Sequence, residues 1–185
     1  MAAAASPGDA CGNGTDWLKR VLIIGSPGAG KTTLAEALAQ RLDLPVLHLD
    51  RIYWLPNWVE RDRKESTALT MAAIAGDRWI IEGNYDATLS LQMRRADTVV
   101  WLDYPTWLCL VRLFKRWQRF RGRARPDVNA WCNEQLNLPF LRYAVRFRRE
   151  AQRSWGAVLS SFPGTLVHLR RPRETRTWLT RQVVA

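Results

Sequence analysis

The sequence predicts an α/β fold in which a parallel sheet is covered by helices on both faces. Short apolar segments alternate with longer segments of helical periodicity, a pattern typical of strand–helix–strand units. The apolar segments are hydrophobic on both faces, as expected of strands buried between two layers of helices. A glycine-rich turn joins the first apolar segment to the first helical one, and it is the most informative stretch of the chain.

The first strand, turn and helix form a recognisable unit. Residues 21–24 read Val-Leu-Ile-Ile and predict a buried strand, whereas residues 33–42 predict a helix with apolar or small residues on one face. Residues 25–32 between them match G-x-x-x-x-G-K-[ST] at every fixed position. Because the motif follows a strand and precedes a helix, the sequence predicts a phosphate-binding loop (P-loop) for a nucleoside triphosphate.

The residue types of this loop suit the binding of phosphates. Glycines let successive backbone N–H groups converge on an anion, and the N-terminus of the following helix adds its positive dipole end. Lys31 can reach the terminal phosphates, and the Thr32 hydroxyl can bind Mg²⁺. The residues expected to bind the nucleotide phosphates are Gly25, Ser26, Pro27, Gly28, Ala29, Gly30, Lys31, Thr32 and Thr33.

The later segments continue the alternation of strands and helices. They predict a strand at residues 45–49, a helix at 62–75 capped by Asp62, a strand at 78–82, a helix at 86–94, a strand at 98–102, helices at 105–120 and 138–159, a strand at 165–169 and a helix from 172. Residues 51–60 are rich in aromatic side chains and proline, and they form either a substrate-facing loop or an aromatic cap over the sheet.

Length and composition indicate one cytoplasmic domain. A chain of 185 residues can bury one full core, and no apolar run approaches the about 18–20 residues that span a bilayer. The three cysteines have no metal-type spacing, which suits a reducing compartment. Residues 1–18 lack the features of a signal peptide and predict a disordered tail, so the domain is expected at residues 19–185. His48 and His168 stand alone in apolar runs and are interpreted as structural.

Acidic residues at the ends of the strands are the candidates for metal and acceptor binding. Glu82 and Asp103 each end an apolar strand, and either could serve the Mg²⁺ at Thr32. The sequence around Asp103 looks more like a strand that ends in a metal-binding acid. The metal-binding acid must, however, lie on a strand beside the first one. That neighbour is usually the third strand, which favours Glu82. Asp50 ends the second strand and faces the same crevice, where it could accept a hydrogen bond from a substrate hydroxyl or act as a general base.

The net charge of +11 is concentrated in the second half of the chain. Residues 105–185 contain 17 Lys and Arg against 4 Asp and Glu. Two helices each carry four arginines on one face, Arg112, Arg116, Arg119 and Arg123 on the first and Arg142, Arg146, Arg149 and Arg153 on the second. With almost no acid on these helices to pair with them, the arginines either bind an external phosphate or nucleic acid or form a tolerated basic surface. Residues 121–127 between the helices look like an arginine-rich lid.

The chain resembles the adenylate-kinase-like P-loop kinases, and within them the group labelled DNA topology modulation protein or FlaR-related. The motifs that carry the resemblance are GSPGAGKTTLA (25–35), HLD (48–50), YWLPNWVER (53–61), WIIEGNY (79–85), ADTVVWLDYP (96–105), RGRARPD (121–127) and LRRPRE (169–174). Adenylate kinases themselves carry Asp-Gly-Phe-Pro-Arg where this chain has Glu82-Gly83-Asn84-Tyr85, so the acceptor is left open.

The resemblance implies a three-layer fold with a five-stranded sheet in the order 2-3-1-4-5, ATP and Mg²⁺ as cofactors, and an arginine lid at about residues 121–130. The implied catalytic residues are Lys31, Asp50, Glu82, Arg116, Arg119, Arg123 and Arg125. Thr32 and Glu82 are expected to serve the metal, and Arg170 and Pro172 to border the adenine. Substrate-binding side chains are expected at Asp50, Tyr53, Trp54, Asn84 and Arg146.

Two functions follow from these observations. The favoured one is a kinase, a monomer or a dimer, that transfers the γ-phosphoryl group of ATP to a small acceptor, possibly a nucleoside monophosphate. The alternative is a nucleic-acid-binding or DNA-topology-modulating P-loop ATPase or regulator, for which the basic second half is the argument.

Overall fold

The computed structural model of the chain describes residues 18–182, and the expected tail at residues 1–17 lies outside this range. Leu18, placed by the sequence at the end of that tail, is buried against the core at 2% exposure. No helix within the described residues is long and apolar enough to cross a membrane.

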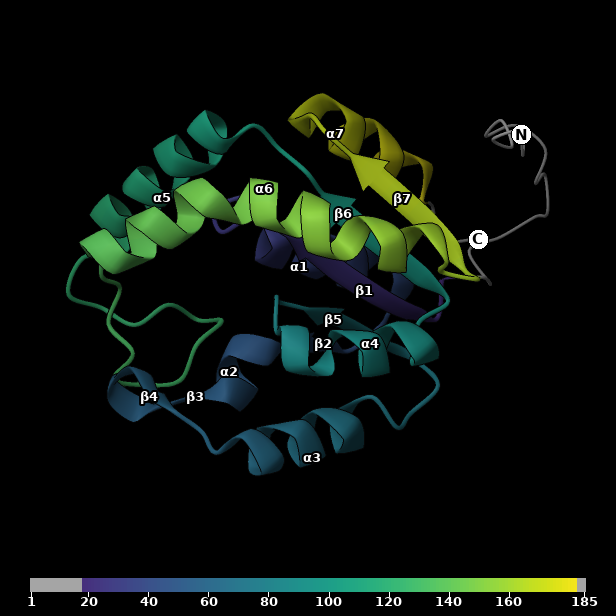
Figure 1. Cartoon of the computed structure of the whole chain (residues 1–185), viewed down its shortest axis with the longest axis horizontal. Helices are drawn as coiled ribbons and strands as arrows, with labels where there is room; N and C mark the ends of the chain where they lie inside the picture. Colours follow the sequence, from purple (N-terminus) through teal and green to yellow (C-terminus); the bar gives the residue numbers. More distant parts are fainter. Residues whose placement is uncertain (1–17, 183–185) are drawn as a thin grey trace.

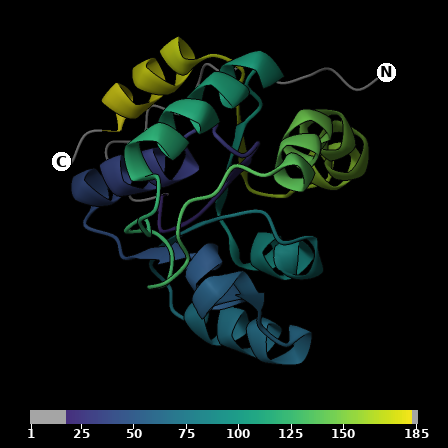
Figure 2. The ribbon, with the colours of Figure 1, turned by 90° about the vertical axis from the view of Figure 1, so that its left-hand side faces the viewer.

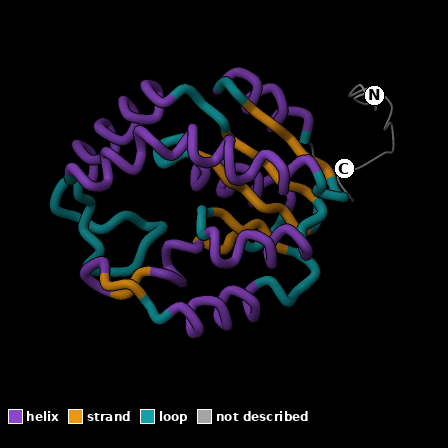
Figure 3. Tube along the Cα trace, viewed as in Figure 1, coloured by secondary structure: helices purple, strands orange, loops and turns teal. Residues whose placement is uncertain are grey.

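A five-stranded parallel sheet forms the centre of the molecule (Figure 1, Figure 3). Its strands are β1 (Arg20–Gly25), β2 (Val46–His48), β5 (Trp79–Glu82), β6 (Thr98–Leu102) and β7 (Thr165–Leu169). They lie side by side in the order β2-β5-β1-β6-β7. Counted along the chain within this sheet, the order is 2-3-1-4-5, so both the predicted fold class and the strand order are confirmed.

Helices cover both faces of the sheet, which gives three layers (Figure 2). On one face lie α1 (Lys31–Leu42), α5 (Thr106–Phe120) and α7 (Pro172–Arg181), and on the other α3 (Arg63–Ala73), α4 (Asp86–Arg95) and α6 (Leu138–Ser160). Successive residues of β1 alternate between the layers, since Val21 and Ile23 belong to one core cluster and Leu22 and Ile24 to the other. This alternation explains why the strands are apolar on both faces.

Residues 51–60, for which the sequence leaves open a substrate-facing loop or an aromatic cap over the sheet, contain short helical and strand segments. The predicted strand at residues 45–49 ends at His48, and the chain continues as α2 (Leu49–Tyr53), β3 (Trp54–Leu55), a 3₁₀ turn (Pro56–Trp58) and β4 (Val59–Glu60). Strands β3 and β4 pair antiparallel, and positive φ angles at Asn57 and Trp58 reverse the chain between them. We call residues 49–60 the aromatic segment.

The connection between α5 and α6 extends over residues 121–137, longer than the predicted lid of 121–130, and we call it the lid. Its backbone reaches across to the aromatic segment (Figure 1). Asn129 Nδ2 donates to the Arg51 carbonyl at 2.9 Å, Trp58 Nε1 to the Asn133 carbonyl at 2.8 Å, and Cys132 Sγ to Leu55 O at 3.3 Å. The lid is therefore anchored on the aromatic segment, at the carboxyl end of β2.

Candidate active site

The P-loop is packed so closely that its glycines are required. A Cβ on Gly25 would lie 2.4 Å from the Leu102 carbonyl oxygen, and one on Gly28 would lie 2.4 Å from that of Cys109. Both glycines also have positive φ, at 146° and 79°. Arg112 supports the loop from α5 by donating to the Ala29 carbonyl at 2.9 Å. The loop is thus a rigid turn held between the end of β6 and α5.

Lys31 lies inside this turn. Its Nζ donates to the Gly25 carbonyl at 2.9 Å and lies 3.4 Å from that of Ser26. Burial lowers the pKa of Lys31, while the nearby carboxylates of Glu82 and Asp50 act in the opposite direction. The ammonium group is held by loop carbonyls at the N-terminus of α1, where an anion is favoured.

Glu82 lies beside the P-loop hydroxyl that is expected to bind Mg²⁺. Thr32 Oγ1 is 3.1 Å from Glu82 Oε1 and 3.3 Å from Asp127 Oδ2 of the lid. His48, the register partner of Glu82 on β2, places its Nδ1 2.9 Å from the same Oε1. Glu82 is thus a buried carboxylate fixed next to Thr32.

This donor set suits Mg²⁺. Magnesium is usually held by one or two carboxylates together with waters and substrate phosphates, and not by a complete cage of protein ligands. Within residues 18–182, no group of three or more His, Cys, Asp or Glu side chains is arranged to hold a metal ion by itself. The Thr32 hydroxyl with the adjacent carboxylates of Glu82 and Asp127 therefore fits a nucleotide-bound Mg²⁺ better than a metal bound by protein alone.

Asp103, the other candidate for the metal, is engaged elsewhere. It is buried at 2% exposure and accepts hydrogen bonds from Arg148 Nε at 2.7 Å and Gln152 Nε2 at 3.1 Å, both on α6. His168 Nε2 on β7 lies 3.2 Å from its Oδ2. These contacts give Asp103 a structural role in joining β6, β7 and α6.

We expect substitutions of the two acids to have opposite consequences. Asp103→Ala removes the partner of Arg148 and His168 and should lower the free energy of unfolding by about 3 kcal/mol. The affinity for Mg²⁺–ATP should stay unchanged.

Glu82→Gln should weaken Mg²⁺-dependent nucleotide binding or turnover by about 10- to 100-fold with little loss of stability. Denaturant unfolding and nucleotide titrations with and without Mg²⁺ measure both effects, and a metal defect in Asp103→Ala would contradict this assignment.

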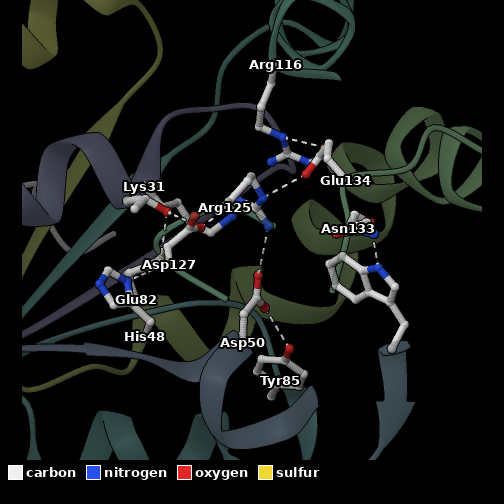
Figure 4. A network of polar contacts seen from close by, with 12 residues as sticks. Lys31, His48, Asp50, Glu82, Tyr85, Arg116, Arg125, Asp127, Asn133 and Glu134 are labelled. Carbon is white, nitrogen blue, oxygen red and sulfur yellow. Dashed lines mark hydrogen bonds and ion pairs between the residues drawn. The ribbon is translucent and has the colours of Figure 1, made fainter. Parts of the chain in front are cut away.

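Asp50 lies between the P-loop and the aromatic segment. Its Oδ1 accepts a hydrogen bond from Tyr85 OH at 2.7 Å, and its Oδ2 lies 3.7 Å from Arg125 NH2 (Figure 4). By surface area the side chain is 35% exposed, but protein atoms surround it on most sides. Burial therefore raises the pKa of Asp50, and the Tyr85 hydrogen bond partly opposes that shift.

Two of the predicted catalytic arginines, Arg116 and Arg125, point into the site, and both meet carboxylates of the lid (Figure 4). Arg125 is 9% exposed and forms ion pairs with Asp127 at 2.6 Å and with Glu134 at 2.8 Å. Arg116 pairs with the other oxygen of Glu134, at 2.8 Å. The arginine contacts thus form a chain from α5 through the lid to Asp50.

Other predicted site arginines lie outside this network. α5 ends at Phe120, so Arg123 is not on the helical stripe, and its exposed side chain has no hydrogen bond or ion pair with any residue from 18 to 182. Arg119 is exposed and stacks over Phe120. Arg146 is exposed on α6. Of the arginine row predicted on the first helix, only Arg116 joins Arg125 in the network, through Glu134.

The remaining predicted site residues lie beside the P-loop, in the aromatic segment and after β7. Asn84 Nδ2 donates to the Gly25 carbonyl at 2.6 Å and its Oδ1 accepts from the Gly25 N–H at 3.1 Å, so it fixes the P-loop. The rings of Tyr53 and Tyr85 are 4.4 Å apart, and Trp54 packs against Tyr53 at 4.9 Å. Thr33 is exposed on the first turn of α1. Arg170 and Pro172 lie between β7 and α7, where the Arg170 N–H donates to Glu174 at 2.7 Å.

Sequence reasoning missed four residues of this network. Asp127 stands in the RGRARPD motif and was available as a signal, whereas Glu134 has no motif around it. Tyr85 follows the third strand, and its contact with Asp50 depends on the pairing of β2 with β5. His48 was interpreted as structural, and the structure places it on Glu82.

A cavity of about 410 Å³ opens beside this network. It is bounded by the aromatic segment, by α3 and by the turn from β5 into α4. Tyr53, Tyr85 and Asn84 line it on the side of Asp50 and the P-loop. Asn84 also binds the Gly25 backbone and Tyr85 also binds Asp50, so the cavity adjoins both at the carboxyl ends of the strands, where ligands bind in open parallel sheets.

Comparisons with known proteins agree with this fold. Residues 21–103 match the family model described as ATPase family associated with various cellular activities. The comparison with curated proteins found no match. The solved structures with a similar fold include a shikimate kinase from Acinetobacter baumannii in complex with shikimate, with a TM-score of 0.56 and 15% identity over 89% of this chain and 90% of that one.

Two further structures give the same result. A candidate kinase from Chloroflexus aurantiacus J-10-fl has a TM-score of 0.52 and 17% identity over 91% of this chain and 100% of that one. A gluconokinase from Sinorhizobium meliloti 1021 has a TM-score of 0.50 and 14% identity over 89% and 93%. At these identities the likeness establishes the fold alone, a five-stranded parallel sheet with helices on both faces that this chain shares with these structures.

Proposed function

We propose that the protein is an ATP-dependent kinase that transfers the γ-phosphoryl group of ATP to a small acceptor. The convergence of Lys31, Thr32, Glu82, Asp50 and Arg125 in one crevice carries this proposal. A P-loop that bound a nucleotide without transferring its phosphate would need only Lys31 and Thr32 of these residues. A second cation at the lid and a carboxylate bound to Tyr85 in the wall of a separate cavity are the additional parts that phosphoryl transfer requires.

Each residue has a distinct part in this function. The P-loop from Gly25 to Thr33 cradles the phosphates, and Lys31 follows the charge on the migrating group. Thr32 and Glu82 would hold Mg²⁺, which neutralises phosphate charge when it is bound. Arg116 and Arg125 bring guanidinium groups from the lid side, and the turn at Arg170 and Pro172 would border the adenine.

The lid acids give the arginines partners when no nucleotide is bound. Asp127 and Glu134 neutralise Arg125, which keeps this buried cation paired in the absence of phosphate. Phosphate oxygens are the competing anions, and a guanidinium fork can grip two of them at once. Arg125 would therefore exchange lid carboxylates for the transferring phosphoryl group.

An ATP-consumption screen tests the proposal. The wild-type protein is incubated with Mg²⁺–ATP and a panel of nucleoside monophosphates, nucleosides, sugars and small acids, and ADP formation is measured. We expect ADP formation that depends on both an acceptor and Mg²⁺. The proposal is wrong if the protein does not bind ATP or if ADP forms at the same rate in a Lys31→Ala protein.

One observation favours a second candidate function, nucleic-acid binding by α6. Arg142, Arg146, Arg149 and Arg153 are exposed, and none has a hydrogen bond or ion pair with another residue in the described range. If the four arginines bind four phosphates of duplex DNA, affinity should fall roughly 10²-fold between 50 and 200 mM salt. Replacing all four by alanine should flatten that dependence. Salt-independent binding, or no binding, would leave only the kinase proposal.

A further inference from the structure

The cavity beside Asp50 has few charges available for a phosphate-bearing acceptor. Its lining contains Arg61 and Arg63 together with the acids Glu60 and Asp86. Arg61 is already engaged, because its Nε donates to the Ile52 carbonyl at 2.7 Å and its NH1 pairs with Glu65. Only Arg63, among the lining arginines, has no guanidinium contact with residues 18–182. The lining is therefore close to neutral.

An acceptor with a phosphate monoester group would need more positive charge than this lining provides. Its second pKa is about 6, so it carries nearly two negative charges at neutral pH, and such groups are usually held by several arginines or lysines. The cavity offers one free arginine beside two acids. Asp50 would add a further negative charge at the point where the acceptor meets the P-loop, which would repel an entering phosphate.

The same carboxylate suits an alcohol. A hydroxyl group is protonated at neutral pH and must lose its proton as it attacks phosphorus, whereas a phosphate oxygen is already ionised. Asp50 connects the cavity wall to the cations that would bind the phosphates. It accepts a hydrogen bond from Tyr85, which lines the cavity, and lies near Arg125 of the lid. Tyr85 donates to one carboxylate oxygen and leaves the other directed toward Arg125 (Figure 4).

We infer that the acceptor is a neutral alcohol, such as a nucleoside or a polyol, whose hydroxyl is deprotonated by Asp50 and whose ring or apolar face packs on Tyr53 and Tyr85. This inference rests on the proposed kinase function. Asp50 takes the hydroxyl proton while the acceptor oxygen forms its bond to the γ-phosphorus. The bond from that phosphorus to the bridging oxygen breaks, and ADP leaves with the electron pair. The products are a phosphate monoester and ADP, and Asp50 releases its proton to solvent.

Matched acceptor pairs test the chemical class. Each nucleoside or sugar is compared with its own monophosphate, and kcat/KM is measured from ADP formation. We expect the unphosphorylated member of an accepted pair to be preferred at least about tenfold, because a phosphate meets Asp50 and a nearly neutral wall. A smaller preference, a preference for the phosphate, or turnover with neither class overturns the inference.

These outcomes separate the inference from the proposed function. Turnover with phosphate acceptors alone would agree with the kinase proposal but would contradict the inference that the acceptor is a neutral alcohol. Absence of turnover with either class removes both. Nucleotide titrations in the same buffer show independently whether the P-loop binds Mg²⁺–ATP.

Asp50→Asn tests the role of the carboxylate. The rate with the accepted alcohol should fall about 100-fold or more, because general-base catalysis contributes that much, and the Kd for Mg²⁺–ATP should change by no more than about twofold. Asp77→Asn is the matched control, since Asp77 is 91% exposed and remote from the cavity lining. An Asp50→Asn protein as active as this control would overturn the inference.

The pH profile gives a readout that a merely structural role would not change. The groups that face Asp50 are Tyr85 and Glu82 from the β5 side, Arg125 from the lid and Lys31 from α1. Because burial raises the pKa of Asp50, activity should fall as pH decreases through a value above the ordinary range for a carboxyl group. Tyr85→Phe removes a donor that stabilises the ionised form, so this acid limb should move to higher pH. An unmoved limb would contradict the positioning of Asp50 by Tyr85.

Discussion

Replacing Lys31 by alanine is expected to lower the rate of phosphoryl transfer by about 10³-fold or more while the fold is preserved. The ammonium group lies on the carbonyls of Gly25 and Ser26, inside the turn that would receive the phosphates. It is the cation best placed to follow charge on the γ-phosphoryl group, and no neighbouring lysine can replace it. Steady-state ADP formation with the best acceptor measures the loss.

Two measurements separate this effect from damage to the fold. The substitution removes hydrogen bonds to loop carbonyls worth about 1 kcal/mol, so the free energy of unfolding should change little. Lys115→Ala is the matched control, because Lys115 is an exposed residue of α5 and should behave as wild type. Equal activity of the Lys31→Ala and Lys115→Ala proteins would show that any observed turnover does not occur at this P-loop.

The order of elements was predictable because each depends on local signals. The P-loop motif, the Asp62 cap and the apolar strands all act within a few residues of one another, and the structure has them at the expected places. Asp62 accepts hydrogen bonds from the N–H groups of Lys64 and Glu65 at the start of α3, as its position suggested. Topology followed from the resemblance, and the register of β2, β5 and β1 agrees with it.

The partners of the arginines were not predictable in the same way. Counting acids on the two arginine-rich helices left these residues without partners and indicated an external anion. In the folded chain Arg116 meets Glu134, 18 residues away, and Arg148, a residue of α6 outside the predicted rows, meets Asp103, 45 residues away. Helical spacing reports only neighbours three or four residues apart, so it cannot detect such tertiary pairs.

The partners of Asp103 and His48 were not predictable for a related reason. A strand sequence shows which residue ends the strand, but it does not show which neighbouring helix supplies a partner. Asp103 ends β6 beside α6 and is bound there, while Glu82 ends β5 beside Thr32 and His48. Only the arrangement of strands and helices distinguishes the two acids.

Replacing Arg125 is expected to be almost as damaging to catalysis as replacing Lys31. An arginine that meets the transferring phosphoryl group contributes about 10³-fold or more in rate. Arg125 is the lid arginine that lies closest to Asp50 and is buried with its carboxylate partners. Arg125→Ala should therefore lower kcat by about 10³-fold, and it should also destabilise the lid because Asp127 and Glu134 lose a shared cation.

Arg125→Lys distinguishes the catalytic from the structural contribution. Lysine keeps the charge that pairs with Asp127 and Glu134, so thermal unfolding should stay close to wild type, but it lacks the planar fork that grips two phosphate oxygens. Most of the rate loss should therefore remain. Arg123→Ala is the matched comparison, since this arginine belongs to the same basic motif but is exposed and without a partner within residues 18–182. If Arg123→Ala were as inactive as Arg125→Ala, or if Arg125→Lys were fully active, the lid would act through its net positive charge and not through the buried fork of Arg125.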